Sequence, residues 1–327
     1  MGAAIHLQRV LAALGLGACG ALLFAWALRI AAGEPVAPGS VAVWVCDRDA
    51  GRVWGLDGAG FLAREERLAF PLELAPAPGG ARYLLQALRP GPDGPCRLLR
   101  LGVTGGSTGE LELESARGLV VDREGTAFAL VGGPERPRLI GWTAGGELLS
   151  LGEWPGGRTL RLGSARLWVL GEREAWPIAR TPSEAQSTLA SSVGWPAERL
   201  LDAVFDVGGS WWLTEGAQRL HLRRLGAASA VILELEAPER TARLVPDGKG
   251  GVWCLGHDGS WRRIDAEGRR GALRIGLQRP QRSACTDGAG GFWAVSPGAV
   301  QRVDGTGRLR LAQGGFDVLV DVDQASP

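Results

Sequence analysis

An aromatic residue recurs along the chain at nearly constant spacing, and this repeat restricts the possible folds more than any other feature. Its members are Trp44, Tyr83, Phe128, Trp168, Trp212, Trp253 and Trp293, separated by 39, 45, 40, 44, 41 and 40 residues. A period of about 40 residues is typical of propellers and solenoids, in which each unit packs against its neighbours. The sequence therefore predicts seven consecutive structural units.

Aspartate and glycine recur in phase with the aromatic residues. An aspartate lies six residues before four of them, at Asp122, Asp206, Asp247 and Asp287. A glycine lies three residues before five of them, at Gly80, Gly125, Gly209, Gly250 and Gly290. Aspartate favours turns by accepting backbone hydrogen bonds, and glycine adopts positive φ at little cost. We interpret these aspartates, together with Asp323, as turn residues rather than as ligands of a cation.

Each unit contains four short strand signals separated by glycine-containing turns. An apolar segment such as 118–121 precedes the aromatic strand, which is represented by 251–255. Segments such as 53–56 and 148–151 provide a third and a fourth strand. After residue 40 no segment shows a convincing helical period. Residues 41–327 are therefore predicted to form an all-β, seven-bladed β-propeller of four-stranded antiparallel blades.

The first unit lacks an opening strand, because a Pro/Gly-rich segment precedes it. The C-terminal segment 316–321 is a spare strand, and we expect it to complete the first blade. Such closure pairs both ends of the propeller in one sheet and protects strand edges that would otherwise remain open. We expect the repeated aromatic side chains to pack between neighbouring blades.

One segment resembles a known family of propellers. Residues 44–53, with the sequence WVCDRDAGRV, resemble the aromatic strand, aspartate and turn of NHL repeats and related propellers. The resemblance extends over about residues 41–323, although most other units lack the aspartate after the aromatic strand. It implies a propeller fold and a tendency toward binding, and it does not imply a reaction.

The N-terminal segment has the character of a membrane anchor. Residues 10–28 form an uncharged run that would span roughly 28 Å as a helix, close to the thickness of a bilayer core. We predict an anchor over residues 1–32 and a linker over 33–40, which places the propeller outside the cytoplasm, in the periplasm or at the cell surface. A cleaved signal peptide is an alternative, and a lipoprotein signal ending at Cys19 is another.

The composition disfavours several classes of function. The chain has 36 basic and 35 acidic residues, a balance unlike that of a dedicated nucleic-acid binder. It contains no asparagine, so the carboxylate and asparagine ligands of calcium-dependent gluconolactonase relatives cannot be reproduced. We identify no catalytic set, cofactor site or metal site, and we expect a protein that is not an enzyme. The alternative is a degenerate lactonase- or lyase-type propeller.

The cysteines do not suggest a metal centre either. Cys46, Cys96, Cys254 and Cys285 lie outside the N-terminal run, and none forms a close C-x-x-C pair that would bind zinc. An exported protein could form a disulfide from them. Alternatively, a cysteine within a strand behaves as a small apolar residue.

The expected binding face is the end of the propeller that carries the loops between second and third strands and the connections between blades. Its charged and aromatic residues are Asp47, Arg48, Asp49, Arg52, Arg89, Asp93, Glu135, Arg136, Glu172, Arg173, Glu174, Trp176, Trp195, Glu215, His257 and Asp258. Charges of both signs suit a protein partner, which we expect to be membrane-associated. The tryptophans could instead stack on a glycan, and the plain alternative is a solvated rim.

Overall fold

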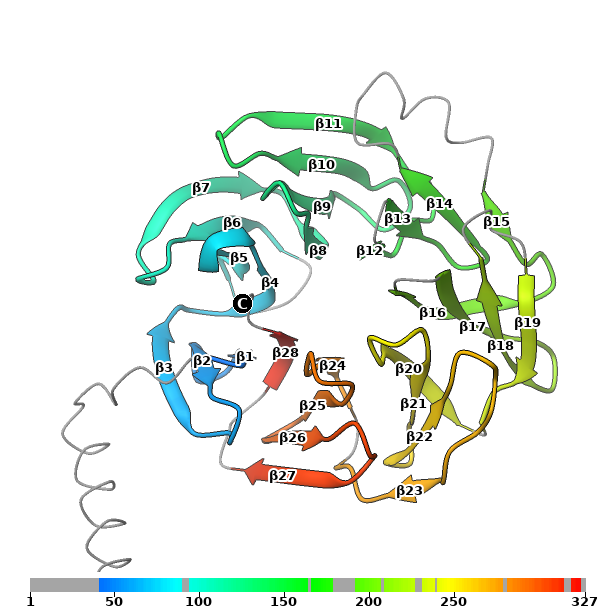
Figure 1. Ribbon diagram of the computed structural model, residues 1–327. Helices are drawn as coiled ribbons and strands as arrows, with labels where there is room; N and C mark the ends of the chain where they lie inside the picture. The colour runs from blue at the N-terminus through cyan, green and yellow to red at the C-terminus, as the bar shows by residue number, and fades with distance from the viewer. Residues whose placement is uncertain are drawn as a thin grey trace, which may run out of the picture.

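Seven four-stranded antiparallel sheets are arranged as blades around a central axis in the computed structural model (Figure 1). The structure describes residues 41–89, 94–163, 166–178, 192–206, 209–226, 231–238, 240–278, 281–314 and 319–324. The predicted all-β propeller with seven blades is confirmed. The predicted anchor and linker, residues 1–40, lie outside the described residues. The part of the chain that is described contains no helix with the length and hydropathy of a membrane span.

The strands of the first four blades run from the axis outward in the following order. Blade 1 comprises β28 (Leu319–Gln324), β1 (Val43–Asp47), β2 (Arg52–Leu56) and β3 (Leu62–Arg67). Blade 2 comprises β4 (Pro71–Pro76), β5 (Arg82–Ala87), β6 (Cys96–Leu101) and β7 (Ser107–Leu113). Blade 3 comprises β8 (Ala116–Val121), β9 (Ala127–Val131), β10 (Arg138–Trp142) and β11 (Leu148–Glu153). Blade 4 comprises β12 (Thr159–Leu162), β13 (Leu167–Leu170), β14 (Glu174–Ile178) and β15 (Val193–Gly194).

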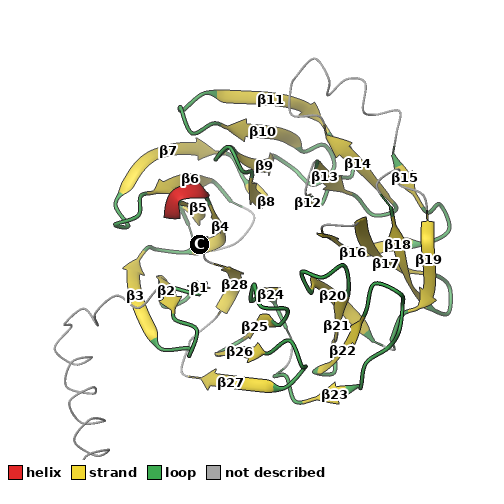
Figure 2. Ribbon diagram, viewed as in Figure 1, coloured by secondary structure: helices red, strands yellow, loops and turns green. Residues whose placement is uncertain are grey.

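The remaining three blades repeat the same order. Blade 5 comprises β16 (Arg199–Asp206), β17 (Gly209–Glu215), β18 (Leu220–Leu225) and β19 (Val231–Glu236). Blade 6 comprises β20 (Thr241–Pro246), β21 (Val252–Gly256), β22 (Ser260–Ile264) and β23 (Arg274–Ile275). Blade 7 comprises β24 (Ser283–Thr286), β25 (Phe292–Ser296), β26 (Ala299–Val303) and β27 (Leu309–Gly314). One short 3-10 turn, η1 (Pro78–Gly80), joins β4 to β5 (Figure 2).

The C-terminal strand closes the ring by pairing with β1. β28 runs antiparallel to β1, from Val43 opposite Gln324 to Asp47 opposite Leu319. A bulge between Cys46 and Asp47 adds one residue to the C-terminal side of the pair. Of the predicted segment 316–321, residues 316–318 lie outside the described residues, and the strand continues past the predicted end to Gln324. The predicted closure of the ring by the C-terminal segment is thus confirmed.

The repeated aromatic side chains lie on the second strand of each blade and pack between neighbouring blades. Trp44 of blade 1 belongs to an apolar cluster with Leu74 and Leu84 of blade 2. Tyr83 of blade 2 is 1% exposed and donates its hydroxyl hydrogen to the Gly125 carbonyl of blade 3 at 2.9 Å. The predicted packing between blades is therefore confirmed, and it forms much of the hydrophobic core.

Blade 5 shifts the aromatic register by one residue. Its repeat residue is Trp211, which donates its indole N–H to Gly250 of blade 6 at 3.0 Å, as Trp253 does to Gly290 of blade 7. Trp212, taken from the sequence as the repeat residue, instead packs edge-on against Trp168 of blade 4. The reason is the length of the first hairpin. Two residues separate its last paired positions, 206 and 209, whereas three separate 247 from 251 in blade 6.

Three of the four repeated aspartates, Asp122, Asp247 and Asp287, cap their own hairpin turns as expected, whereas Asp206 accepts the backbone N–H of Gly250 in blade 6 at 2.9 Å. One carboxylate oxygen of Asp247 accepts hydrogen bonds from the backbone N–H groups of Lys249 and Gly251, both at 2.8 Å. Asp122 and Asp287 accept equivalent pairs of bonds in blades 3 and 7. Gly250 has a φ of 86°, in the left-handed region that favours glycine. The side chain of Asp323 lies outside the described part of the structure.

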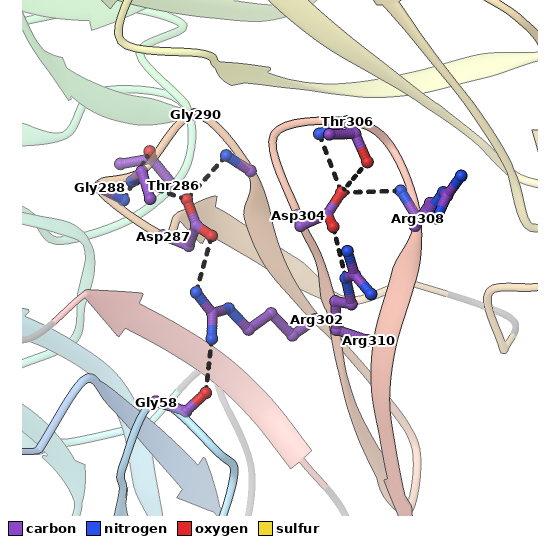
Figure 3. A network of polar contacts seen from close by, with 12 residues as sticks. Gly58, Thr286, Asp287, Gly288, Gly290, Arg302, Asp304, Thr306, Arg308 and Arg310 are labelled. Atoms are coloured by element: carbon purple, nitrogen blue, oxygen red, sulfur yellow. Dashed lines mark hydrogen bonds and ion pairs between the residues drawn. The ribbon is translucent and has the colours of Figure 1, made fainter.

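Arginines on third strands connect each of three blades to the next. Figure 3 shows Arg302 of blade 7 between two acceptors, Asp287 of its own blade at 3.2 Å and the Gly58 carbonyl of blade 1 at 2.5 Å. In the same way, Arg100 donates to Ala144 of blade 3, and Arg224 donates to Ala266 of blade 6. Together with the aromatic donors, these arginines link the turns of consecutive blades around the ring.

Candidate functional site

The two ends of the propeller differ in the loops that they carry. Because the strands of each blade are antiparallel, the first-to-second and third-to-fourth turns lie at one end, which we call the turn face. The second-to-third loops and the blade-to-blade connections lie at the other end, which we call the connection face. The predicted binding residues belong to the connection face. Asp93 is the exception that cannot be placed, because it lies outside the described residues.

Most of the predicted residues on the connection face are paired locally and stay apart from one another. Asp47 is 1% exposed and accepts a hydrogen bond from the Ala50 backbone, so it is a turn residue and not part of an accessible surface. The other local pairs are Arg48 with Asp49, Arg52 with Glu65, Glu215 with Arg199, and Asp258 with Ser260 and Arg240. Arg89, Arg136 and His257 are exposed at separate loops.

Five of the predicted residues meet at one pocket between blades 3 and 4. This interblade pocket has a volume of about 620 Å³. Glu135 reaches it from the β9–β10 loop. The β13–β14 hairpin contributes the other four, Glu172, Arg173, Glu174 and Trp176. The pocket is further lined by Arg117, Pro134, Pro155, Gly156, Gly157 and Arg158. The sequence predicts that these loops lie on one face, and the structure shows that the loops of blades 3 and 4 form a pocket there.

One tryptophan, Trp176, lines the interblade pocket, and a buried tryptophan supports it from behind. Trp176 is partly exposed, and its ring packs at 6.1 Å from that of Trp154, which is 2% exposed. Trp154 is fixed in turn by an indole hydrogen bond to the Leu151 carbonyl at 3.1 Å. A buried aromatic support of this kind holds the outer ring in one orientation, so Trp176 is available as a rigid contact surface.

The rim of the interblade pocket carries three acidic and three basic side chains. Arg158 pairs with Glu172 at 2.9 Å, and both side chains are about half exposed. Arg173 donates to the Pro196 carbonyl at 3.0 Å, and Arg117 donates to the Gly157 carbonyl at 3.2 Å. Exposed pairs of this kind contribute little to stability, typically about 0–1 kcal/mol, so they can exchange partners when a ligand arrives.

A second cavity, of about 460 Å³, occupies the central channel. Six innermost strands line it, namely β4, β8, β12, β16, β20 and β24, which surround the axis in Figure 1. Its charged residues are Glu73, Arg161, Asp202, Arg243 and Arg282. None of these residues is among the binding residues predicted from the sequence. Each lies in or next to an expected innermost strand, but no spacing pattern distinguishes them from other strand residues.

Blade 5 contains a polar cluster that was not predicted from the sequence either. Glu198 accepts hydrogen bonds from Arg223 and Thr214, and its carboxylate lies 3.9 Å from the His221 ring. Hydrogen bonds from Arg223 and Thr214 lower the pKa of Glu198 to about 2, against the opposing effect of burial, which raises it. Arg223 is 8% exposed and also contacts Glu234 at 2.8 Å. These contacts tie the connection before blade 5 to its second, third and fourth strands.

No group of three or more histidine, cysteine, aspartate or glutamate side chains with a metal-binding arrangement occurs in the described ranges. None of the four cysteines in the described part of the chain forms a disulfide. Burial raises the pKa of Cys96 to about 11 and that of Cys254 to about 12. These two thiols therefore remain protonated near neutral pH and pack as small apolar groups.

No protein-family profile matches the chain, and no curated protein matches it. Solved structures with the same fold do match. Apo AztD from Citrobacter koseri is 11% identical, with a TM-score of 0.59, over 87% of this chain and 98% of that one. BamB from Moraxella catarrhalis is 12% identical, with a TM-score of 0.53, over 87% and 88%. A candidate 6-phosphogluconolactonase from Bacteroides fragilis is 12% identical, with a TM-score of 0.60, over 88% and 100%.

These similarities establish the fold and nothing more specific. The three proteins bear different names, although their identities to this chain all lie at 11–12%. Seven-bladed propellers host unrelated functions, so any function has to be argued from the interblade pocket and the channel.

Proposed function

We propose that this protein is a non-enzymatic binding module, tethered to a membrane by its N-terminal segment, with its propeller outside the cytoplasm. The resemblance of residues 44–53 to NHL repeats agrees with a role in binding. The observation that supports the proposal most strongly is the interblade pocket, where Trp176 lies between charges of both signs. A rigid aromatic side chain surrounded by a polar rim is typical of an anchor point at a protein–protein interface.

The proposed ligand is a segment of a membrane-associated protein partner. Trp176, Pro134 and Pro155 offer apolar contact area, while Glu135, Arg158 and Glu172 offer hydrogen bonds and charge pairs at the edge. A segment with one apolar side chain and flanking polar groups fits this arrangement. The balanced rim disfavours a strongly charged polyanion as the ligand.

The test is purification of the full-length protein from gently solubilised membranes. We expect a stoichiometric companion that is lost from the Trp176→Ala variant. Phe61→Ala is the matched control, because Phe61 is an exposed aromatic residue, 54% accessible, on the turn face. Isolation of a monomer without a companion, or equal recovery of the companion with Trp176→Ala, would contradict the proposal. Turnover of a lactone by the pure protein would favour the degenerate enzyme instead.

A glycan is the second candidate ligand for the same pocket, because tryptophan rings stack on sugar rings. The partly exposed ring of Trp176 favours this candidate. Titration with cell-wall sugars would then quench Trp fluorescence, and the change would be absent from Trp176→Ala. Saturable quenching in the wild type, without any protein companion, would select the glycan.

A further inference from the structure

The turn face carries exposed apolar side chains that the interblade pocket does not use. Among the described residues, six of the nine large apolar side chains that are exposed lie at turns between third and fourth strands, namely Phe61, Val103, Leu148, Val231, Ile232 and Leu309. A single exposed apolar side chain is normal on a protein surface. Their recurrence at one class of turn, and therefore at one end of the ring, requires a physical reason.

Four of these residues come from consecutive blades and form what we call the apolar arc. They are Leu309 of blade 7, Phe61 of blade 1, Val103 of blade 2 and Leu148 of blade 3, and they are 39–59% exposed. Their turns lead into the outermost strands β27, β3, β7 and β11, which follow one another around the edge of the ring (Figure 1). The apolar arc thus extends over four of the seven blades.

Three of the four hairpins in the apolar arc are held by an arginine from the preceding blade. Arg302 of blade 7 donates to the Gly58 carbonyl in the hairpin of blade 1, at 2.5 Å (Figure 3). Arg64 of blade 1 donates to the Val103 carbonyl in blade 2, and Arg100 of blade 2 donates to the hairpin of blade 3 in the same way. These bonds fix the hairpins relative to one another, so the apolar side chains form a pre-organised surface.

The chain enters the propeller at the middle of the apolar arc. The Ala42 N–H donates to the Leu56 carbonyl at 2.8 Å, and Leu56 is the last residue of β2 before the turn that carries Phe61. Residues 29–40 separate this point from the uncharged run of the predicted anchor, and a chain of that length spans at most about 43 Å when fully extended. A short tether that ends at the turn face keeps this face close to the membrane.

We propose that the apolar arc rests on the phospholipid bilayer that holds the predicted anchor, with its four side chains in the interfacial region. This inference rests on the tether of the proposed function. Apolar side chains gain free energy by entering the interface, in proportion to the area that they bury there. Exposed charges of both signs, such as Glu147 and Arg308, flank the arc, so the apolar side chains rather than a net charge provide the attraction.

This docking orients the interblade pocket as well. When the turn face lies on the bilayer, the connection face points away from it, and Trp176 points away with it. A strand of five or six residues alone spans about 17–20 Å, so the pocket stands at least that far above the membrane surface. A membrane-associated partner would therefore contact the pocket with a segment that projects well beyond its own membrane span.

The experiment measures energy transfer from tryptophan to a dansyl-labelled lipid in phosphatidylcholine vesicles that contain the full-length protein. Every protein carries Trp26→Phe, so that all donors belong to the propeller. Replacement of the four arc residues by serine should reduce the transfer roughly twofold, because the propeller then moves away to the length of its tether. Phe61→Ser alone should give a smaller loss. Ile275→Ser is the matched control, because Ile275 is 73% exposed, lies opposite Ser260 toward the connection face, and should leave the transfer unchanged.

An alkaline carbonate wash of the same vesicles distinguishes the apolar arc from the tether. Protein that stays with the vesicles, with equal transfer in wild type and both serine variants, would overturn the arc and leave the proposed function standing. Protein released by the wash would contradict the tether and this inference with it. The substituted residues are exposed, so both variants should keep the thermal midpoint of the wild type. A dimer in light scattering that Phe61→Ser dissociates would assign the arc to a second copy of the chain and overturn the proposal.

Discussion

The turn face and the connection face of this propeller differ in the contacts that their polar side chains make. On the turn face, short hairpins recur in nearly the same form, and donors such as Tyr83, Trp253 and Arg302 reach the turns of the next blade. On the connection face, loops vary in sequence, and charged residues pair within a loop or with a neighbouring strand. The regular turn face closes the ring, which leaves the connection face free to vary and to serve as the proposed binding face.

Removal of β28 is the strongest challenge to this view of ring closure. Truncation after Gly314 would leave β1 as an unpaired innermost edge and open the contact between blades 7 and 1. We expect loss of cooperative unfolding and association into oligomers, measured by thermal denaturation and size-exclusion chromatography. A truncated protein that remains monomeric with an unchanged melting temperature would show that closure by this strand is dispensable.

A pair of aspartate variants compares the two faces directly. Asp247→Ala on the turn face removes the acceptor of two backbone N–H groups and leaves Arg263 without its partner, so we expect a loss of about 2–4 kcal/mol. Asp258→Ala on the connection face removes a partly exposed turn carboxylate, with an expected loss of about 0.5–1 kcal/mol. Chemical denaturation measures both values. Equal losses would contradict the contrast between the faces.

The Glu198 cluster in blade 5 predicts that the free energy of unfolding depends on pH in the acid range. The pKa of Glu198 is lowered from 4.5 to about 2, so its contribution is complete above pH about 4.5 and disappears as the pH falls toward 2. Glu198→Gln should reduce stability by about 1–3 kcal/mol at neutral pH and flatten the pH dependence over this window. Denaturant titrations at several pH values test this. An identical slope in wild type and variant would count against the network.

The smallest expected difference concerns two arginines, one on each face. Arg302→Met removes the link from blade 7 to the Gly58 carbonyl of blade 1, and we expect a loss of about 1–2 kcal/mol. Arg173→Met removes a bond to Pro196 on the connection face and should cost less than about 0.5 kcal/mol. Comparison of the two melting temperatures is sufficient. A larger effect for Arg173 would reverse the assignment of structural and variable faces.

The repeat made the fold predictable, because the aromatic strand and its turn obey local rules. The aspartate of an Asp-Gly turn bonds to backbone N–H groups two and four residues later, as Asp247 does, so the sequence alone locates the turn. In blade 5 the same rule gives the wrong repeat residue. Its first hairpin is shorter by one residue, so Trp211 rather than Trp212 packs toward the next blade, and only the strand pairing shows this.

For the candidate sites, too, some features follow from the sequence and others only from the tertiary structure. The sequence alone determined the seven blades, closure by the C-terminal segment, and the end of the ring that holds the variable loops, because these follow from strand order and turn chemistry. Only the tertiary structure brought Glu135 beside Trp176 and gathered Arg161, Arg243 and Arg282 around one axis. These residues come from different blades, and their proximity results from how the sheets are rotated around the ring, which no local pattern in the chain encodes.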